Sequence, residues 1–339
     1  MESSRPIVAD YRQDWPAKAA ALITELYAGL GPHAVLIEHI GSTSIPGMAA
    51  KDVLDLQVST TDLEAAASAF DPMLHNLGFE RSRYERDHVP AGRQDDPDLW
   101  AKRLWTRKSQ PAGDVNLHVR LCGSPNERLA LLFRDWFRAH ADAVPAYAGF
   151  KQALSAMSTG IDDYTDTKDW VVDVVNVAAE EWAAATGWRV PEPPIRRRAG
   201  RVIVVNAAAQ VLLLHGFDPA RPAEPYWITI GGGLNEGETP AEAAARELRE
   251  ESGIRATAAQ LGDPVWHELT RFPFDHRDYL QDQDFFLLRV GSPEVTTDGL
   301  EEEEATIILG HRWWSVADLE STDEQFYPVE LPRLLRDLV

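Results

Sequence analysis

The sequence is poor in cysteine and in long apolar runs. Cys122 is the single cysteine among 339 residues, which excludes an internal disulfide. Because it ends an expected strand, we predict that it is a small core residue. No stretch of about 18 apolar residues is present, and no apolar segment follows a basic one at the N-terminus. These absences predict a cytoplasmic protein that does not span a membrane.

Basic residues are also few. The chain has 33 Lys and Arg against 54 Asp and Glu, which gives a formal net charge of −21. A surface of this sign repels long nucleic acids and anionic membranes. It still admits a small anionic ligand, because a bound cation or a local Arg or Lys reverses the field in a cleft. Charge therefore predicts a small-molecule partner, and it leaves homodimerisation open.

The length suits two domains of ordinary size. Residues 191 to 194 read PEPP and predict a stiff, extended connector. We place an N-terminal domain at residues 1 to 187, a linker at 188 to 199 and a C-terminal domain at 200 to 339. Apolar periodicity predicts mixed α/β (α+β) structure in both. The expected helices are 15–30, 62–77, 126–140, 147–157, 169–185, 240–252, 317–319 and 330–338, and the expected strands are 34–40, 53–59, 115–122, 201–206, 210–214, 226–230, 265–274, 279–290 and 306–315.

The most informative segment is residues 232 to 254, GGLNEGETPAEAAARELREESGI. Thr239 is a good N-cap, Pro240 fits the first helical position, and Glu242 completes a capping box. Gly253 provides the end of the helix. The segment therefore predicts a glycine-containing loop that runs into a well-capped amphipathic helix.

One face of this helix carries Glu247, Glu250 and Glu251, which we expect to be exposed. They are three and four residues apart, and like charges at this spacing destabilise a helix. Acidic groups near a helix C-terminus also oppose its macrodipole. A hard divalent cation with oxygen ligands, Mg²⁺ or Mn²⁺, would remove both penalties. The alternative is a solvated acidic helix end.

The segment resembles the Nudix box, G-x5-E-x7-R-E-U-x-E-E-x-G-U with U aliphatic, at every specified position. The resemblance implies a Nudix α/β/α sandwich that hydrolyses a nucleoside diphosphate linked to another moiety, with Mg²⁺ or Mn²⁺. It implies that Glu247, Glu250 and Glu251 bind the metal and that Glu251 also acts as a general base. The further implied roles are orientation of the carboxylates by Arg246, support of the loop by Glu238, and close approach of the backbone to phosphates at Gly231, Gly232 and Gly233.

Nudix folds often carry a further acidic residue on a loop before a late strand. Residues 301 to 304 (EEEE) occupy that place, and we select Glu302 and Glu304 as additional metal ligands. The alternative is a solvated acidic loop.

Polar residues alternate on two strands of the N-terminal domain. Asp55 and Gln57 point to one side of the first strand, and His118 lies between two further polar residues on one side of the later strand. If the strands are neighbours, these faces meet beside the turn at Gly41 and Ser42, whose N–H groups and hydroxyl suit a phosphate. The alternative is an exposed sheet face without a ligand.

Residues 39 to 58, HIGSTSIPGMAAKDVLDLQV, resemble the GrpB family of predicted nucleotidyltransferases, and the match continues through residues 116–119, 133–136, 147–151 and 164–169. The resemblance implies a nucleotidyltransferase-like α/β fold with a mixed sheet, in which Gly41 and Ser42 open the site and Asp55 carries metal. Lys51 adds a cationic contact and His118 a further ligand.

The N-terminal domain departs from the pattern of catalytic nucleotidyltransferases. Enzymes of that broad fold use two acids, two residues apart, plus a third on another strand to hold two metals. Gln57 stands at the second position. We therefore expect binding of a nucleotide or phosphate ligand at least as readily as nucleotidyl transfer.

The leading hypothesis is a Mg²⁺-dependent Nudix-type hydrolase that cleaves a phosphoanhydride bond in a nucleotide or nucleoside diphosphate derivative. Its N-terminal domain binds a nucleotide or phosphate ligand. The rival hypothesis is a nucleotide-sensing or nucleotide-binding protein in which the N-terminal domain is a regulatory or folding module or a weak nucleotidyltransferase. The intact Nudix box favours the first.

Overall fold

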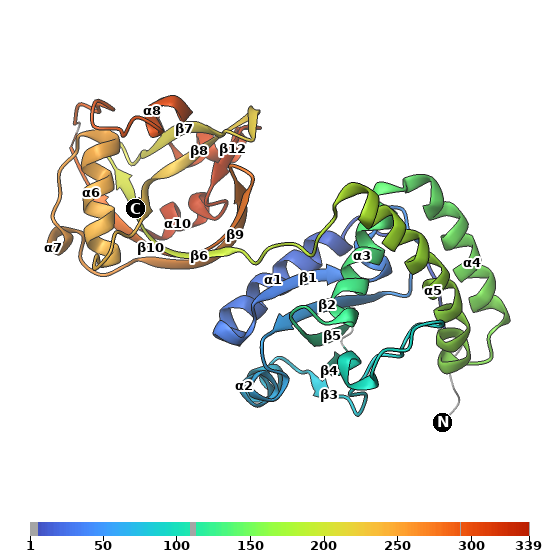
Figure 1. Cartoon of the computed structure of the whole chain (residues 1–339). Coiled ribbons are helices and arrows are strands. Elements are labelled where there is room, and N and C mark those ends of the chain that lie inside the picture. Colours follow the sequence, from blue (N-terminus) through green and yellow to red (C-terminus); the bar gives the residue numbers. More distant parts are fainter. Residues whose placement is uncertain (1–5, 109–112, 292, 339) are drawn as a thin grey trace. The chain divides into compact units, whose positions relative to one another are not determined.

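The computed structural model describes residues 6–108, 113–291 and 293–338. The chain divides into two compact units, Met1–Pro193 and Pro194–Val339, which we call the N-terminal and the C-terminal unit (Figure 1). Residues 195 to 199 belong to a strand that begins at Ile195, although the sequence placed them in the linker. The expected domain limits at 187 and 200 otherwise stay a prediction.

Within the described residues, the N-terminal unit consists of five α-helices, a five-stranded sheet and short 3₁₀ turns. The helices are α1 (Trp15–Leu30), α2 (Leu63–Asn76), α3 (Pro125–Ala139), α4 (Val144–Met157) and α5 (Ile161–Thr186), and the turn η2 covers Ser42–Ser44. The strands are β1 (Leu36–Ile40), β2 (Val53–Thr60), β3 (Glu80–Arg81), β4 (Lys102–Arg107) and β5 (Asp114–Leu121). The sheet order is β1-β2-β5-β4-β3; β2 and β5 are parallel and the other pairs antiparallel.

The parallel pair of β2 and β5 gives the sheet a polar face. In the register, Asp55 lies opposite Asn116. Two residues further on, Gln57 lies opposite His118. α3 covers this face, since the Gln57 amide donates to the backbone carbonyl of Glu127 in that helix (3.3 Å). The two strands are therefore neighbours, as the meeting of their polar faces requires.

The C-terminal unit is built on a seven-stranded mixed sheet. Its strands are β6 (Ile195–Val205), β7 (Val211–Asp218), β8 (Arg221–Gly233), β9 (Trp266–Phe274), β10 (Arg277–Arg289), β11 (Ile308–Trp314) and β12 (Gln325–Tyr327). Its helices are α6 (Pro240–Ser252), α7 (Ala258–Leu261), α8 (Glu304–Ile307), α9 (Val316–Ser321) and α10 (Leu331–Leu338). The order is β11-β7-β8-β6-β10-β9, with β12 beside β8 and with β6 and β10 parallel.

Alternate residues of β6 point into two different cores. Val202 packs in one core with Leu248 of α6. Ile203 packs in the other with Leu335 of α10. Helices thus lie on both faces of the sheet, as Figure 1 shows for α6 and α10. This α/β/α sandwich, together with the mixed sheet of the N-terminal unit, confirms the fold class expected from the sequence.

α6 begins and ends at the residues that the sequence indicates. The Thr239 hydroxyl accepts from the backbone N–H of Glu242, whose side chain accepts in return from the N–H of Thr239. Gly253 closes the helix in a left-handed conformation with φ of 69°. Caps of this kind satisfy terminal backbone groups and define where the helix begins.

Several elements differ from the sequence prediction. The strands β3, β4 and β12 were not predicted, because they are very short or, in β4, interrupted by charged residues. α5 begins at Ile161 rather than at residue 169. Cys122 is exposed and not part of the core, since β5 ends one residue earlier at Leu121. Within the described ranges, no helix is both long enough and apolar enough to cross a membrane.

Gly200 permits the close crossing of α6 over β6. A Cβ on Gly200 would lie 1.9 Å from the carbonyl oxygen of Pro240. Gly200→Ala should therefore lower the free energy of unfolding by about 1–3 kcal/mol, the usual cost of overpacking. Gly233→Ala is the matched control, because its Cβ would meet its nearest neighbour at 3.9 Å. Chemical denaturation measures both, and equal destabilisation by the two variants would contradict this account.

Candidate functional sites

α6 carries two glutamates into the interior of the C-terminal unit. Leu248 is fully buried against the sheet, and its neighbours on the helix, Glu247 and Glu251, are only 6% and 8% exposed. Gly232 leaves the necessary room, since a Cβ there would lie 2.3 Å from a carboxylate oxygen of Glu247. The backbone N–H of Gly231 donates to Glu251 Oε2 at 2.8 Å. Gly231 to Gly233, which the sequence placed in a loop after a strand, are the last residues of β8, and this segment, which we call the glycine loop, packs directly against the carboxylates.

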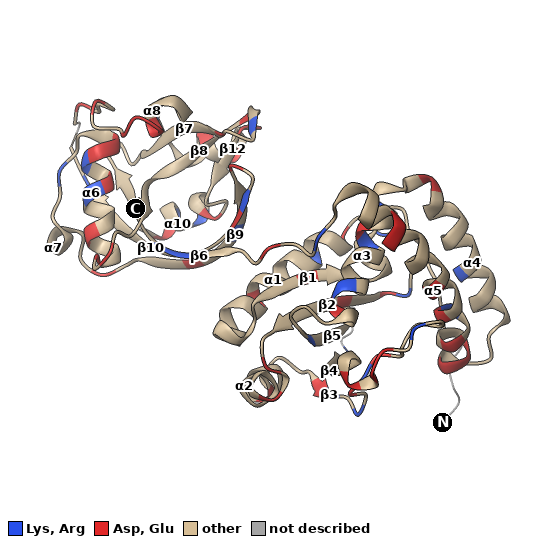
Figure 2. Cartoon of the chain, viewed as in Figure 1, with Lys and Arg blue, Asp and Glu red and all other residues tan. Residues whose placement is uncertain are grey.

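Glu304 in α8 completes a cluster with Glu247 and Glu251. One carboxylate oxygen from each lies within 4.8 Å of the other two. Three such oxygens fit Mg²⁺ or Mn²⁺, because these cations take carboxylate ligands and fill their remaining positions with water or phosphate oxygens. In the part of the chain that the structure describes, this is the one group of three or more acidic, His or Cys side chains so arranged. Figure 2 shows several acidic residues in red along α6.

The cluster is electrostatically unfavourable by itself. Burial, together with the nearby charge of Glu247, raises the pKa of Glu251 to about 8, against the opposing effects of the Gly231 N–H and Arg201. Burial also raises the pKa of Glu247. A buried carboxylate keeps its proton unless an opposite charge compensates it. The site thus has the properties of a cation site.

Arg246 ties the glycine loop to the carboxylate face of α6. It forms a two-point ion pair with Glu238, with Nε–Oε1 at 2.9 Å and Nη2–Oε2 at 3.1 Å. Its Nη1 donates to Glu247 Oε1 at 2.8 Å and to Glu250 Oε2 at 3.2 Å. Its Nη2 also donates to the carbonyl of Gly233 at 3.0 Å. These charge-assisted bonds fix the carboxylates in one orientation.

The expected acidic residues separate into two groups. Glu247, Glu251 and Glu304 come together, whereas Glu302 is exposed and outside the cluster. Glu250 also lies outside it and pairs with arginines instead. The expectation that this face of the helix is exposed was wrong for Glu247 and Glu251, because α6 packs closely enough on β6 and β8 to bury them.

The sequence analysis missed Arg201. Its guanidinium is buried and donates to the carbonyls of Thr229 (2.9 Å) and Gly231 (3.1 Å) and to Gln283 Oε1 (2.7 Å). It therefore holds the backbone at the start of the glycine loop and acts electrostatically on Glu251. A charged residue at the start of the apolar run RVIVV was the available signal.

In the N-terminal unit, the turn at Gly41 and Ser42 lies against Asp55. Gly41 has φ of 69°, and a Cβ there would lie 2.5 Å from Asp55 Oδ2. Only glycine suits this combination of conformation and contact. Ser42 begins η2, and its Oγ accepts from Lys151 Nζ at 2.7 Å. The structure thus brings Gly41, Ser42 and Asp55 together, as the sequence predicts.

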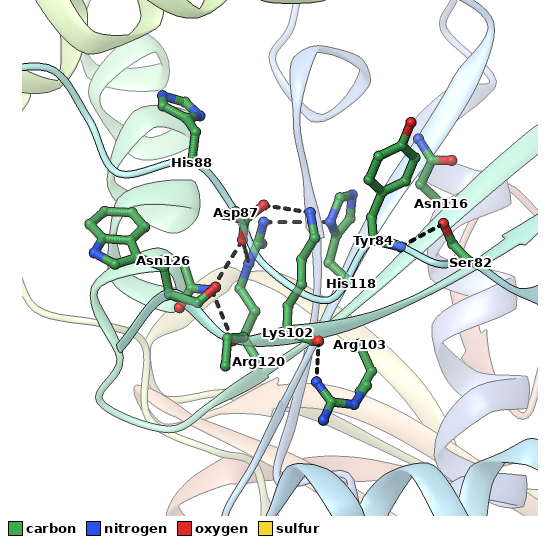
Figure 3. Close-up of polar contacts among 12 residues, drawn as sticks. Ser82, Tyr84, Asp87, His88, Lys102, Arg103, Asn116, His118, Arg120 and Asn126 are labelled. Carbon is green, nitrogen blue, oxygen red and sulfur yellow. Dashed lines mark hydrogen bonds and ion pairs between the residues drawn. The ribbon is translucent and has the colours of Figure 1, made fainter. Parts of the chain in front are cut away.

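A chain of polar contacts runs from Asp55 along β5. Asp55 Oδ1 accepts from the Asn116 amide at 2.9 Å and lies 3.6 Å from His118 Nε2. On the other side of the ring, His118 Nδ1 lies 3.4 Å from Arg120 Nη2. Arg120 Nε donates to Asp87 Oδ2 at 2.9 Å. Figure 3 shows Asn116, His118, Arg120 and Asp87 along this path.

At the far end of this series of polar contacts, oppositely charged side chains form a neutralised ion network. Asp87 also accepts from Lys102 Nζ (2.5 Å) and from Asn126 Nδ2 (3.1 Å). Burial acts to raise the pKa of Asp87, but the charges of Arg120 and Lys102 outweigh it and hold that pKa far below its usual range. We interpret this network as a structural support for the face that carries His118.

The surroundings of Asp55 do not fit a pair of metals. Gln57 is buried, and its amide oxygen accepts from Arg120 Nη1 at 2.6 Å, so the position of a second acid is already engaged. Burial acts to raise the pKa of Asp55, but His118 and Asn116 hold it below its usual value. Among the residues that the structure describes, no group of three metal-ligating side chains includes Asp55.

Two lysines beside this site had no role in the sequence analysis. Lys151 and Lys168 stand in the segments 147–151 and 164–169 that carry the family resemblance. Lys51, which was predicted, has its Nζ 5.4 Å from the ring centre of Tyr164. Lysine spacing alone gives no signal, because these residues come from different elements that only the fold brings together.

Both units match families of known proteins. Residues 5–177 match the family model described as GrpB protein, and residues 195–334 match the one described as NUDIX domain. The fold and sites therefore define a two-domain chain, one GrpB unit followed by one Nudix unit. The chain belongs to the GrpB family. The presence of the NUDIX domain supports the assignment of this chain as a Nudix-type hydrolase.

Individual relatives cover one part of the chain each. The dephospho-CoA kinase of Mycolicibacterium paratuberculosis is 35% identical over 191 residues, which are 52% of this chain and 46% of that protein. The chain thus spans about half the length of that relative. The crystal structure of the conserved protein GrpB from Enterococcus faecalis covers 52% of this chain and 99% of its own, at 24% identity and a TM-score of 0.43. The MutT protein from Methanosarcina mazei covers 42% and 93%, at 19% identity and a TM-score of 0.33.

The raised pKa of Glu251 predicts a pH-dependent stability in the absence of metal. The carboxyl is protonated in the folded chain up to a pH of about 8, whereas it ionises near its ordinary pKa of 4.5 in the unfolded chain. Its contribution is therefore fully present below that lower value and declines as the pH rises towards about 8. In EDTA, Glu251→Gln should have the melting temperature of the wild type at pH 4 and a higher one at pH 8.

Glu250→Gln is the control for this measurement, because Glu250 is on the same helix but outside the cluster. The difference in melting temperature between Glu250→Gln and the wild type should not increase with pH as that of Glu251→Gln does. A constant difference between Glu251→Gln and the wild type across this pH range would contradict burial of an uncompensated carboxyl.

Proposed function

We propose that the Nudix domain hydrolyses a phosphoanhydride bond in a nucleotide or nucleoside diphosphate derivative and that it requires Mg²⁺ or Mn²⁺. The buried cluster of Glu247, Glu251 and Glu304 is the observation that supports this most, because it is unfavourable unless a cation compensates it. When bound there, the cation would supply Lewis acidity towards phosphate oxygens. The small-molecule substrate agrees with the net charge of −21.

The chain's own residues orient the reacting groups. Arg246 holds Glu247 and Glu250 before substrate arrives, so less ordering remains for the reaction itself. Glu251 is the proposed general base for water, because it lies within the cluster that would hold the cation and the N–H of Gly231 fixes its Oε2. The absence of a side chain at Gly232 lets the Glu247 carboxylate lie directly against the backbone of the glycine loop.

For the GrpB domain, we propose binding of a nucleotide or phosphate ligand at Gly41, Ser42, Lys51, Asp55 and His118, with weak nucleotidyl transfer or none. The turn at Gly41 and Ser42 supports the binding. The engagement of Gln57 by Arg120 supports the lack of efficient transfer, because it leaves one carboxylate where two metals need three.

Glu251→Gln and Glu304→Gln should each lower the turnover of hydrolysis by at least about 100-fold, because each removes one charge from the cluster. Glu302→Gln should retain nearly the wild-type rate, since that side chain is exposed outside the cluster. The measurement is release of phosphate or mononucleotide from a panel of nucleotide derivatives with Mg²⁺, with circular dichroism as the control for folding. Near-normal hydrolysis by Glu251→Gln would exclude this mechanism.

The GrpB site predicts a second, separable binding event. In the full chain, Asp55→Ala and Ser42→Ala should weaken calorimetric binding of a nucleotide while hydrolysis by the Nudix domain stays unchanged. Glu181→Ala, an exposed change on α5, is the control and should alter neither. A second measurement follows transfer of a labelled nucleotide to an acceptor. Rapid transfer that depends on Asp55 would show that the domain is a catalytic transferase after all.

A further inference from the structure

Lys151 on α4 is a buried cation. The residue is only 1% exposed, and its Nζ donates to the hydroxyl of Ser42 at 2.7 Å. The same Nζ lies 5.1 Å from the ring centre of Tyr147. Within residues 6–108, 113–291 and 293–338, no carboxylate forms an ion pair with it. Its ammonium group is therefore surrounded by a neutral hydroxyl and an aromatic ring.

Two further lysines, Lys51 and Lys168, act electrostatically on Lys151. Lys51 lies over Tyr164 and likewise has no ion pair with a carboxylate of the described residues. Lys168 on α5 pairs with the adjacent Asp169 at 3.1 Å. The charge of Lys168 lowers the pKa of both Lys51 and Lys151, although burial contributes more, and the charge of Lys51 acts on Lys151 as well. The three ammonium groups thus repel one another in one partly enclosed region.

Such an arrangement is costly without an anion. Burial lowers the pKa of Lys151 to about 7, which shows how poorly the folded chain solvates its charge. The chain has 54 acidic residues, so neutralising carboxylates are abundant elsewhere. Asp55 is the carboxylate that acts electrostatically on both Lys51 and Lys151, and its Oδ1 is already engaged by Asn116. Asp169, which pairs with Lys168, also acts on Lys51, so two carboxylates face three lysines and leave a net positive charge.

We propose that Lys51, Lys151 and Lys168 bind a chain of two or more phosphates beside Ser42, and that this binding needs no divalent cation. The inference rests on the proposed phosphate binding by the GrpB domain and names its ligand class and its principal contacts. Lys151 and Ser42 form the inner end of the site, because their side chains are already hydrogen-bonded to each other. Lys51 and Lys168 contact the outer phosphates.

The number of donors favours a phosphate chain over a single phosphate. The three ammonium groups have nine N–H donors, one of which binds Ser42, whereas a phosphate monoester offers three terminal oxygens. Each further phosphate adds negative charge and oxygens that accept from ammonium groups. Metal is not needed for these contacts, because the ammonium groups themselves donate to the phosphate oxygens. The site thereby differs from the glutamate cluster of the Nudix domain, which repels anions until it holds a cation.

The test is calorimetry of the full chain with orthophosphate, inorganic tripolyphosphate and ATP, each in EDTA and again in Mg²⁺. In EDTA we expect tripolyphosphate and ATP to bind, and orthophosphate to bind at least about ten-fold more weakly. Equal affinity for ATP and tripolyphosphate assigns recognition to the chain of phosphates alone. Tighter binding of ATP assigns the ligand to nucleotides, and both results support the lysine site.

Variants identify the contacts. Lys151→Met should weaken tripolyphosphate binding about ten-fold or more and raise the melting temperature of the ligand-free protein, because it removes a buried charge without a partner. Lys168→Met, which is only partly buried, should weaken binding without a large change in folding. Lys18→Met is the matched control, since Lys18 is also partly buried and pairs with a carboxylate, that of Asp14 at 3.0 Å. It should leave both the affinity and the melting temperature unchanged.

Four results would overturn the inference. Binding that requires Mg²⁺ would refute the metal-free site but leave the proposed phosphate binding intact. Undiminished affinity in Lys151→Met and Lys168→Met would refute the assigned contacts. If orthophosphate binds as tightly as tripolyphosphate, the proposal that the site recognises two or more linked phosphates would be refuted. Absence of binding by every ligand, with and without Mg²⁺, would refute the proposed function of the GrpB domain as well.

Discussion

Burial of like charges is the constraint that both units of this chain share. In the C-terminal unit, Glu247 and Glu251 are buried together with Glu304 close by. In the N-terminal unit, Lys151 is buried beside Lys51. A buried charge without a partner destabilises a fold by more than most hydrogen bonds stabilise it. Such sites persist when an ion or ligand of opposite sign compensates them, so the sign of each cluster indicates what it binds.

An arginine organises each of these sites, with opposite consequences. Arg246 pairs fully with Glu238 and only partly with Glu247, so the cluster keeps carboxylate oxygens for a cation. Arg120 instead occupies the oxygen of Gln57 and one oxygen of Asp87. The polar side chains on this face of the GrpB sheet are thus engaged in contacts with one another, apart from the region around Asp55. This difference supports the proposals of a metal site in one unit and of a metal-free anion site in the other.

More of the Nudix site than of the GrpB site could be predicted from the sequence, because most residues of the Nudix site lie close together along the chain. The caps of α6, the contacts of Arg246 and the glutamates of the box lie within 23 consecutive residues, 232 to 254, so spacing predicts the caps and the resemblance to the Nudix box implies the rest. The choice of Glu304 over Glu302 depends on where α8 begins, which four consecutive glutamates do not reveal. The burial of Glu251 depends on how closely α6 approaches β6, a property of packing rather than of the motif.

The GrpB site shows the opposite case. Ser42 and Lys151 are 109 residues apart and meet because α4 returns to the turn after β1. Apolar periodicity predicted both elements but not their contact, since period and propensity carry no information about which faces of distant elements meet. Asp87, which anchors the polar chain below His118, lies outside every predicted element. Long-range polar contacts of this kind are the part of a site that a single sequence leaves undetermined.

Together, the two proposed sites would distinguish phosphate ligands that carry a metal ion from those that do not. A phosphate chain that carries Mg²⁺ presents a cation to the glutamates and less negative charge to the lysines. The same chain without metal is repelled by the glutamates and attracted by the lysines. One polypeptide with both sites would therefore respond to the complexed and the free forms through different units. Neither unit needs a contact with the other for this discrimination, because it follows from the sign of the charge that each fold buries.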